Sequence, residues 1–190
     1  MKDDPWLDRW LDVMGPPQPD LTVLELGCGD GLDTEVLVEA GYEVIAADLS
    51  ETQLRRCVQV APAARHVLLD VREPLPFADA SFRAIMASLC LHYFEWDRTE
   101  RAMAEIHRCM CTGGRLAVRV NSTNDVNHGA VGHREISHLL YDVDGRQKRF
   151  FDRESLDGLL EGWRVSSVNE MTMGRWALPK VVWEVFAWKR

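Results

Sequence analysis

Three glycines at alternate positions are the most informative chemical feature of this chain. They are Gly27, Gly29 and Gly31, and they follow the apolar run 23–26, which contains the acid Glu25. Such a run predicts a buried strand that leads through a glycine-rich turn into a helix. Glycine tolerates positive φ and lets a ligand approach the backbone with no Cβ in the way. We therefore expect a nucleotide-like ligand over this turn.

The spacing of the glycines separates two kinds of nucleotide ligand. A dinucleotide fingerprint needs G-x-G-x-x-G. Here its third glycine falls at Leu32, and the chain has G-x-G-x-G instead. The spacing therefore argues against a nucleotide-dependent oxidoreductase, which we keep as the weaker alternative.

Two further acids stand where expected strands end. Asp48 follows the apolar run 44–47, and Asp70 follows the run 67–69. In an open α/β sheet, ligands bind outside the carboxyl ends of the strands. An ionised carboxylate there accepts strong hydrogen bonds from ribose hydroxyls. The alternative for Asp48 is a helix cap.

The wording E-L-G-C-G around Cys28, together with Asp48 and Asp70, resembles the class I S-adenosylmethionine-dependent methyltransferases over about residues 21–120. The resemblance implies that Asp48 binds ribose, that Asp70 accepts from the adenine amino group, and that S-adenosylmethionine is the cofactor. The Asp-Pro-Pro-Tyr or Asn-Pro-Pro-Tyr signature of amino-group methyltransferases is absent, so we expect a small-molecule acceptor. The residues that the resemblance places at the cofactor are Glu25, Gly27, Cys28, Gly29, Gly31, Asp48, Leu49, Asp70, Val71 and Ser88.

Polar side chains after two later strands are candidates for contact with the acceptor. As catalytic bases we consider His92 and His128, because a hydroxyl acceptor usually needs a base. An amine or thiolate needs none, and each candidate has a structural alternative as a core, surface or turn residue. The candidates for substrate binding are Tyr93, Arg119, Asn121 and Asn124.

Apolar runs alternate with helical patterns along the chain, which predicts parallel βαβ units. We expect one α/β, Rossmann-like domain over 1–190, with a mainly parallel seven-stranded sheet, helices on both faces and an antiparallel last strand. Its parts are an N-terminal helix and linker (1–20), a cofactor-binding core (21–120), an irregular lid or substrate segment (121–151), and a C-terminal helix and strand pair (152–190). The expected strands lie near 21–26, 42–47, 65–69, 82–88, 116–120, 163–168 and 181–188.

Composition limits the partners and the compartment. The chain has 190 residues and a net charge of −8, which opposes nonspecific binding to nucleic acid or anionic membranes. No apolar run approaches the ~18 residues of a membrane span, and the first residues lack the apolar stretch of a signal peptide. The five cysteines are scattered. We expect a cytoplasmic protein with reduced thiols and no metal, and the oligomeric state stays open.

These features favour a methyltransferase for a small molecule. They support cofactor binding more directly than catalysis, so a non-catalytic S-adenosylmethionine-binding protein on the same fold remains the alternative.

Overall fold

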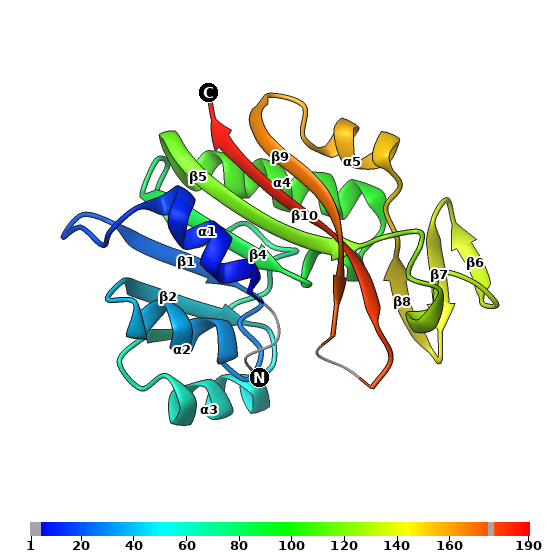
Figure 1. Ribbon diagram of the computed structural model, residues 1–190, viewed down its shortest axis with the longest axis horizontal. Coiled ribbons are helices and arrows are strands. Elements are labelled where there is room, and N and C mark those ends of the chain that lie inside the picture. Colours follow the sequence, from blue (N-terminus) through cyan, green and yellow to red (C-terminus); the bar gives the residue numbers. More distant parts are fainter. Residues whose placement is uncertain (1–4, 175–176) are drawn as a thin grey trace.

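A seven-stranded sheet forms the framework of the protein in its computed structural model, which describes residues 5–174 and 177–190 (Figure 1). The strand order is β3-β2-β1-β4-β5-β10-β9. All neighbours are parallel except that β10 is antiparallel to β5 and β9. The expected sheet with an antiparallel last strand is confirmed. The strands are β1 (Thr22–Leu26), β2 (Glu43–Asp48), β3 (Arg65–Leu68), β4 (Phe82–Ser88), β5 (Met110–Asn121), β9 (Trp163–Met173) and β10 (Lys180–Lys189).

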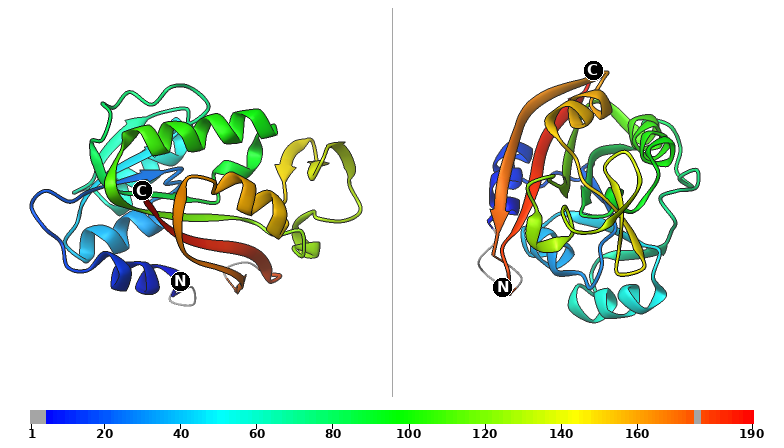
Figure 2. Two further views of the ribbon diagram at one scale, coloured as in Figure 1. Left: turned by 90° about the horizontal axis from the view of Figure 1, so that it is seen from above. Right: turned by 90° about the vertical axis from the view of Figure 1, so that its right-hand side faces the viewer.

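Helices cover both faces of this sheet (Figure 2). Successive strand residues point to opposite faces, so Leu24 packs in a core with α4 and α5, whereas Val23 packs in a second core with α1, α2 and α3. No helix within the described ranges is long and apolar enough to cross a bilayer. The helices are α1 (Trp6–Met14), α2 (Leu32–Glu39), α3 (Glu51–Val60), α4 (Trp96–Cys109) and α5 (Arg153–Leu159), with the short 3-10 turns η1 (Leu91–Tyr93) and η2 (Val126–His128).

The N-terminal helix forms where its apolar spacing predicts it. In α1, the side chains of Trp6, Trp10 and Met14 are buried on the face turned to the sheet. Residues 1–4, which begin the expected segment 1–20, lie outside the described residues.

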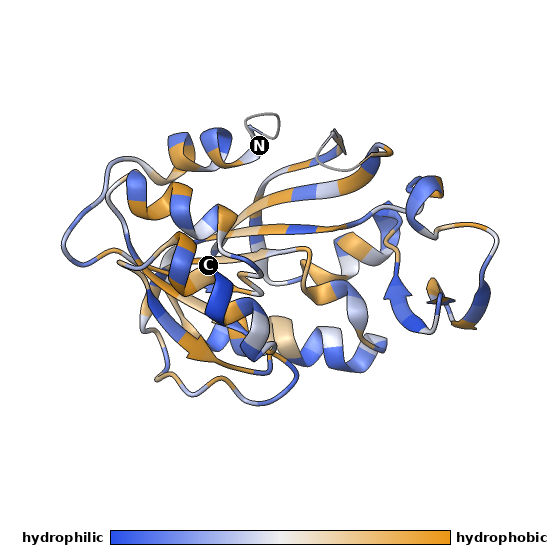
Figure 3. Cartoon of the chain, turned by 90° about the horizontal axis from the view of Figure 1, so that it is seen from below, coloured by the Kyte–Doolittle hydropathy of each residue, from blue (hydrophilic) through white to orange (hydrophobic). Residues whose placement is uncertain are grey.

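The segment after β5 is a small antiparallel sheet, not the irregular stretch expected over 121–151. Its strands are largely hydrophilic and lie at one end of the molecule (Figures 1 and 3). Asp144 and Gly145 join two of them, with positive φ of 53° and 78°. Two positive φ values are the mark of a type I′ hairpin, for which Asp-Gly is a preferred sequence. We call this sheet the cap; its strands are β6 (Arg134–Ser137), β7 (Leu140–Val143) and β8 (Arg146–Arg149).

Two strands are longer than their apolar cores predict. β5 begins at Met110 and not near residue 116, so Gly113 and Gly114 lie within the strand. A register shift in β4 between Phe82 and Ala84 accommodates this extension. β9 extends to Met173 because its polar outer half pairs with β10 along its whole length.

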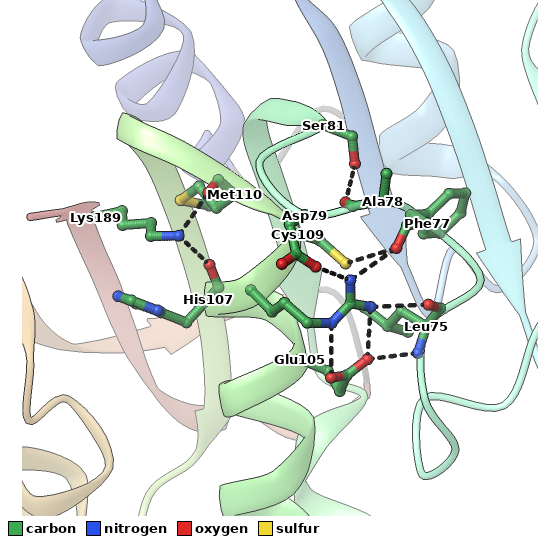
Figure 4. A network of polar contacts seen from close by, with 11 residues as sticks. Leu75, Phe77, Ala78, Asp79, Ser81, Glu105, His107, Cys109, Met110 and Lys189 are labelled. Atoms are coloured by element: carbon green, nitrogen blue, oxygen red, sulfur yellow. Dashed lines mark hydrogen bonds and ion pairs between the residues drawn. The ribbon is translucent and has the colours of Figure 1, made fainter.

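The loop after β3 is held against α4 by one guanidinium (Figure 4). Arg108 donates to the carbonyl oxygens of Leu75 and Phe77 at 3.0 and 2.8 Å. It also pairs with Glu105 and Asp79 at 2.8 and 2.7 Å. These contacts lie at the end of α4 and fix the path of the chain between β3 and β4.

Candidate functional site

The glycine turn lies at the carboxyl edge of the sheet and is bonded to the end of β2. The amides of Gly27 and Cys28 both donate to the carbonyl oxygen of Ala47, at 2.7 and 3.0 Å. The amide of Gly29 donates to Oδ2 of Asp48 at 2.9 Å. The structure therefore brings the turn and Asp48 together, as the resemblance implies.

The three glycines of the turn have different structural roles. All three have positive φ, of 72°, 56° and 89° in chain order. A Cβ on Gly27 would overlap that of Cys90, and one on Gly31 would lie 2.8 Å from the Cα of Cys57. A Cβ on Gly29 would meet nothing within 4 Å. Close packing thus requires Gly27 and Gly31, while Gly29 borders open space beside Asp48.

Asp48 has spare hydrogen-bonding capacity. Its Oδ1 accepts from the amide of Ser50 at 2.8 Å, and its Oδ2 accepts from Gly29. A carboxylate offers about four lone-pair sites, so two accepted bonds leave room for ribose hydroxyls. Leu49 beside it is 56% exposed, an unusual position for a large apolar side chain that a flat ring would cover.

Asp70 is placed differently from its expected position at a strand end. β3 ends at Leu68, so Asp70 lies in the loop that follows. Its two carboxylate oxygens accept from Arg72, with a shortest distance of 2.6 Å. This guanidinium holds the pKa of Asp70 below its ordinary value. Contact with an adenine amino group stays a prediction, and Val71 is half-buried against the core.

Glu25 is the buried acid of the site. Only 2% of its surface is exposed, and its Oε2 accepts from Oγ1 of Thr34 at 2.6 Å. Burial, and next the negative charge of Asp33, raise its pKa from 4.5 to about 8. Sequence reasoning missed Thr34 because its role depends on the first turn of α2 packing over β1.

Arg119 anchors β5 to the helices on one face of the sheet. Its side chain is fully buried and its guanidinium lies 3.9 Å from the ring centroid of Trp6. Nε donates to Oγ of Ser88 at 2.9 Å, and Nη2 lies 3.3 Å from Asp33. We expected Arg119 to bind substrate and Ser88 to face the cofactor. Strand β5 points Arg119 toward α1 and α2, and both contacts expected of Arg119 and Ser88 stay predictions.

His92 and Tyr93 lie together in η1, directly after β4. Their ring centroids are 4.2 Å apart. His92 is 2% exposed, and its Nδ1 has no hydrogen-bond partner among the described residues. Burial, followed by the positive charges of Lys180 and Lys148, lowers the pKa of His92 well below 6.5. Its imidazole is therefore neutral at pH 7 and able to accept a proton.

The other candidates for the acceptor site come from the chain after β5. Asn121 is fully buried; its Nδ2 donates to the carbonyl oxygen of Arg149 at 3.3 Å, and its Oδ1 has no hydrogen-bond partner among the described residues. Asn124 instead donates to Glu170 of β9 at 2.9 Å. His128 contacts the carbonyl oxygen of Leu178 at 3.1 Å. Only Asn121 thus offers an unused buried acceptor, while Asn124 and His128 brace the chain against the β9–β10 hairpin.

An ion pair that sequence reasoning missed supports this region. Nζ of Lys180 lies 2.9 Å from Oδ2 of Asp125, and both side chains are buried. Oδ1 of Asp125 also accepts from the amide of Val181. The partners are 55 residues apart in sequence, so no local spacing pattern identifies them.

A cavity of about 580 Å³ lies away from the glycine turn, between the starts of α4 and α5 and the cap. It contains none of the residues expected at the cofactor or acceptor. Four of its ten lining residues are acids, which disfavour a negatively charged ligand such as a nucleotide phosphate. The glycine turn is therefore the better candidate for a nucleotide site. The lining residues are Glu95, Trp96, Asp97, Ser137, His138, Leu139, Arg149, Asp152, Glu154 and Ser155.

Comparisons of the sequence with known proteins agree with this geometry. A family model described as a methyltransferase domain matches residues 24–118, half of the chain. The chain is 28% identical over 176 residues to a malonyl-[acyl-carrier protein] O-methyltransferase of Pseudescherichia vulneris, covering 92% of this chain and 62% of that protein. It is 32% identical over 113 residues to a demethylmenaquinone methyltransferase of Renibacterium salmoninarum, covering 60% and 46%. The chain thus spans about three fifths of the length of the first of these relatives.

Solved structures share the fold. A structure described as a SAM-dependent methyltransferase of Methanosarcina mazei superposes with a TM-score of 0.75 at 19% identity, covering 90% of this chain and 93% of that one. The 1,6-didemethyltoxoflavin-N1-methyltransferase of Burkholderia thailandensis gives 0.74 at 24% identity, covering 98% and 77%.

Proposed function

This chain belongs to the methyltransferase domain family, and from that premise we propose that it transfers a methyl group from S-adenosylmethionine to a small-molecule acceptor. The observation that carries the proposal is the open space at Gly29, bordered by a carboxylate with unused acceptor capacity. An adenosyl group fits this chemistry, because its ribose needs hydrogen-bond acceptors and its base needs an apolar surface such as Leu49. When bound, the cofactor supplies an activated methyl group on a sulfonium.

The residues of this chain would then act chiefly by positioning. Alignment of a nucleophile with a leaving group contributes about 7–11 kcal/mol to catalysis. Asp48 and the glycine turn hold one reactant, while the η1 turn borders the other. With a hydroxyl acceptor, the neutral imidazole of His92 takes the proton as the bond to the methyl group forms.

Burial of His92 changes the pH dependence expected of such a base. The unperturbed pKa of histidine is about 6.5, which on sequence alone predicts loss of activity below that pH. Because the pKa of His92 is lowered, the decline belongs at lower pH. If His92 is the base, kcat stays constant as the pH falls through about 6.5 and declines only at lower pH. His92→Gln then removes most turnover.

Cofactor binding and turnover are tested separately. S-adenosylhomocysteine at 100 times its Kd adds about 2.7 kcal/mol to stability, which a thermal shift assay detects, and NADH is the negative control. Asp48→Asn weakens this binding at least about tenfold, because hydrogen bonds to a charged group contribute about 1.5–3 kcal/mol each. Stabilisation by NADH alone refutes the proposal in favour of an oxidoreductase.

Formation of S-adenosylhomocysteine with a panel of acceptors decides between enzyme and binding protein. Binding without turnover across that panel identifies the non-catalytic alternative. A cytoplasmic location, and the expected absence of nucleic-acid and membrane partners, stay predictions.

A further inference from the structure

Positive charge gathers on one face of the cap strand β8. β8 packs against η1. Its residues alternate in direction, so Arg146 and Lys148 share one face, and Gln147 and Arg149 share the other. Arg149 reaches the carbonyl oxygens of Phe94 and His138 on its own side.

Neither charge on this face is neutralised by a described residue. Nζ of Lys148 donates to the carbonyl oxygen of His128 at 3.0 Å, which satisfies a hydrogen bond but supplies no counter-charge. Arg146 is exposed and has no ion pair among the described residues. Glu135 lies on the same face two strands away, but its carboxylate accepts from the amide of Leu139 at the neighbouring turn.

Both charges affect the pKa values of residues in the η1 turn. Burial raises the pKa of Tyr93; the charge of Asp48 adds to the rise, and that of Arg146 opposes it. Lys148 contributes to the lowered pKa of His92. Tyr93 belongs to η1, against which β8 of the cap packs. In a chain of net charge −8, unpaired cations at this place need a specific reason.

We propose that the acceptor is an anion, a carboxylate or a phosphate ester, held between η1 and Arg146 and Lys148 of the cap. The inference rests on the proposed function, because it assigns the chemistry of the acceptor at the same site. The buried Nδ1 of His92, without a partner among the described residues, is a nitrogen in η1 that can donate to an anion when it carries the imidazole proton. Opposite charges also favour the encounter between the acceptor and this face.

The test compares acceptors that differ only in charge. S-adenosylhomocysteine formation is measured with matched sets of carboxylic acids, phosphate esters and the corresponding primary amides and alcohols. We expect turnover of the anionic members, with a KM that rises with ionic strength because salt screens the attraction. In Arg146→Gln/Lys148→Gln, KM for the anionic acceptor rises at least about tenfold, while the Kd for S-adenosylhomocysteine stays the same.

Two variants sharpen the comparison. Arg134→Gln is the matched control, since Arg134 lies on the opposite face of the cap and pairs with Asp142 at 3.3 Å; it leaves KM unchanged. Arg146→Glu/Lys148→Glu reverses the charge and abolishes the preference for anions. Turnover of only neutral or cationic acceptors overturns the inference and leaves the proposed function standing. An unchanged KM in Arg146→Gln/Lys148→Gln has the same meaning, whereas no turnover of any acceptor overturns both.

Discussion

Replacing Glu25 by glutamine measures how the buried carboxyl affects the free energy of unfolding, separately from how it affects ligand binding. The carboxyl is 2% exposed and its pKa rises from 4.5 to about 8. A rise of this size corresponds to about 5 kcal/mol, because a tenfold change in proton affinity is about 1.4 kcal/mol. The fold favours the protonated form. The stabilisation is therefore complete below pH 4.5 and is lost as pH rises through about 8.

Glu25→Gln removes this titration but keeps the local contacts. A glutamine carbonyl still accepts from Oγ1 of Thr34, 2.6 Å away in the wild type. The free energy of unfolding, measured with urea at pH 5, 6, 7 and 8, should show the variant gaining on the wild type by several kcal/mol between the extremes. Glu43→Gln, at an exposed position on β2, is the matched control. Parallel pH profiles for Glu25→Gln and wild type would falsify the reasoning.

The same variant tests the predicted ligand role of Glu25. S-adenosylmethionine carries an ammonium and a sulfonium, and a nearby positive charge favours the ionised carboxylate. Binding to the wild type should therefore release a proton between pH 6 and 8, seen in calorimetry as a dependence of the heat on buffer ionisation. Glu25→Gln should bind without this release. Equal proton release in both proteins would place Glu25 outside the cofactor site.

Three further changes use the packing of the glycine turn and the buried ion pair of Lys180 and Asp125. Gly29→Ala should cost only about 1 kcal/mol of stability yet weaken S-adenosylhomocysteine binding at least about tenfold by calorimetry, because its Cβ projects into the open space. Gly31→Ala should show a larger loss in urea unfolding, about 1–3 kcal/mol or more, since its Cβ lies 2.8 Å from the Cα of Cys57. Lys180→Met should destabilise by about 3–5 kcal/mol by leaving Asp125 buried without its cation, and Asp125→Asn/Lys180→Met should recover part of that loss.

Local patterns predicted the parts of the fold whose cause is local. The apolar run ending at Leu26 and the glycines after it place a strand and a turn, because burial and positive φ are properties of neighbouring residues. The acid Asp48 was found for the same reason. The pairing of β10 with β5 joins segments about 65 residues apart, so its direction and register do not follow from any pattern of neighbouring residues.

The cap escaped prediction because its strands are polar and partly exposed. Hydrophobic alternation, the main signal for a strand, is absent from Arg146-Gln147-Lys148-Arg149. The turn signal was present in Asp144-Gly145, flanked by two four-residue segments. A hairpin that is stabilised by such a turn and by edge contacts needs little apolar alternation. The turn residues were therefore better evidence for these strands than the hydrophobic pattern.

The sequence also did not predict which side chains contact one another. Arg119 stands at the ligand edge of the sheet, which made it a plausible substrate contact. Its guanidinium lies against Trp6 and Asp33 instead, and these partners are 113 and 86 residues away in sequence. Position at an edge follows from the strand pattern, but direction and pairing depend on α1 and α2, which no local signal attaches to β5.

The charged side chains near the glycine turn and η1 have opposite signs, which bears on methyl transfer. Asp33 in the first turn of α2 and Asp48 lie next to the glycine turn, while Arg146 and Lys148 lie on β8, which packs against η1. These charges are the basis of our two proposals, a cationic methyl donor beside the glycine turn and an anionic acceptor beside η1. In such a transfer, the sulfonium and the anion would lose their opposite charges together. That loss is easier in a poorly solvated site than in water, because water stabilises the separated ions. The buried state of His92 and Asn121, beside η1 and at the end of β5, fits such a site: each keeps a polar atom available where solvent is excluded.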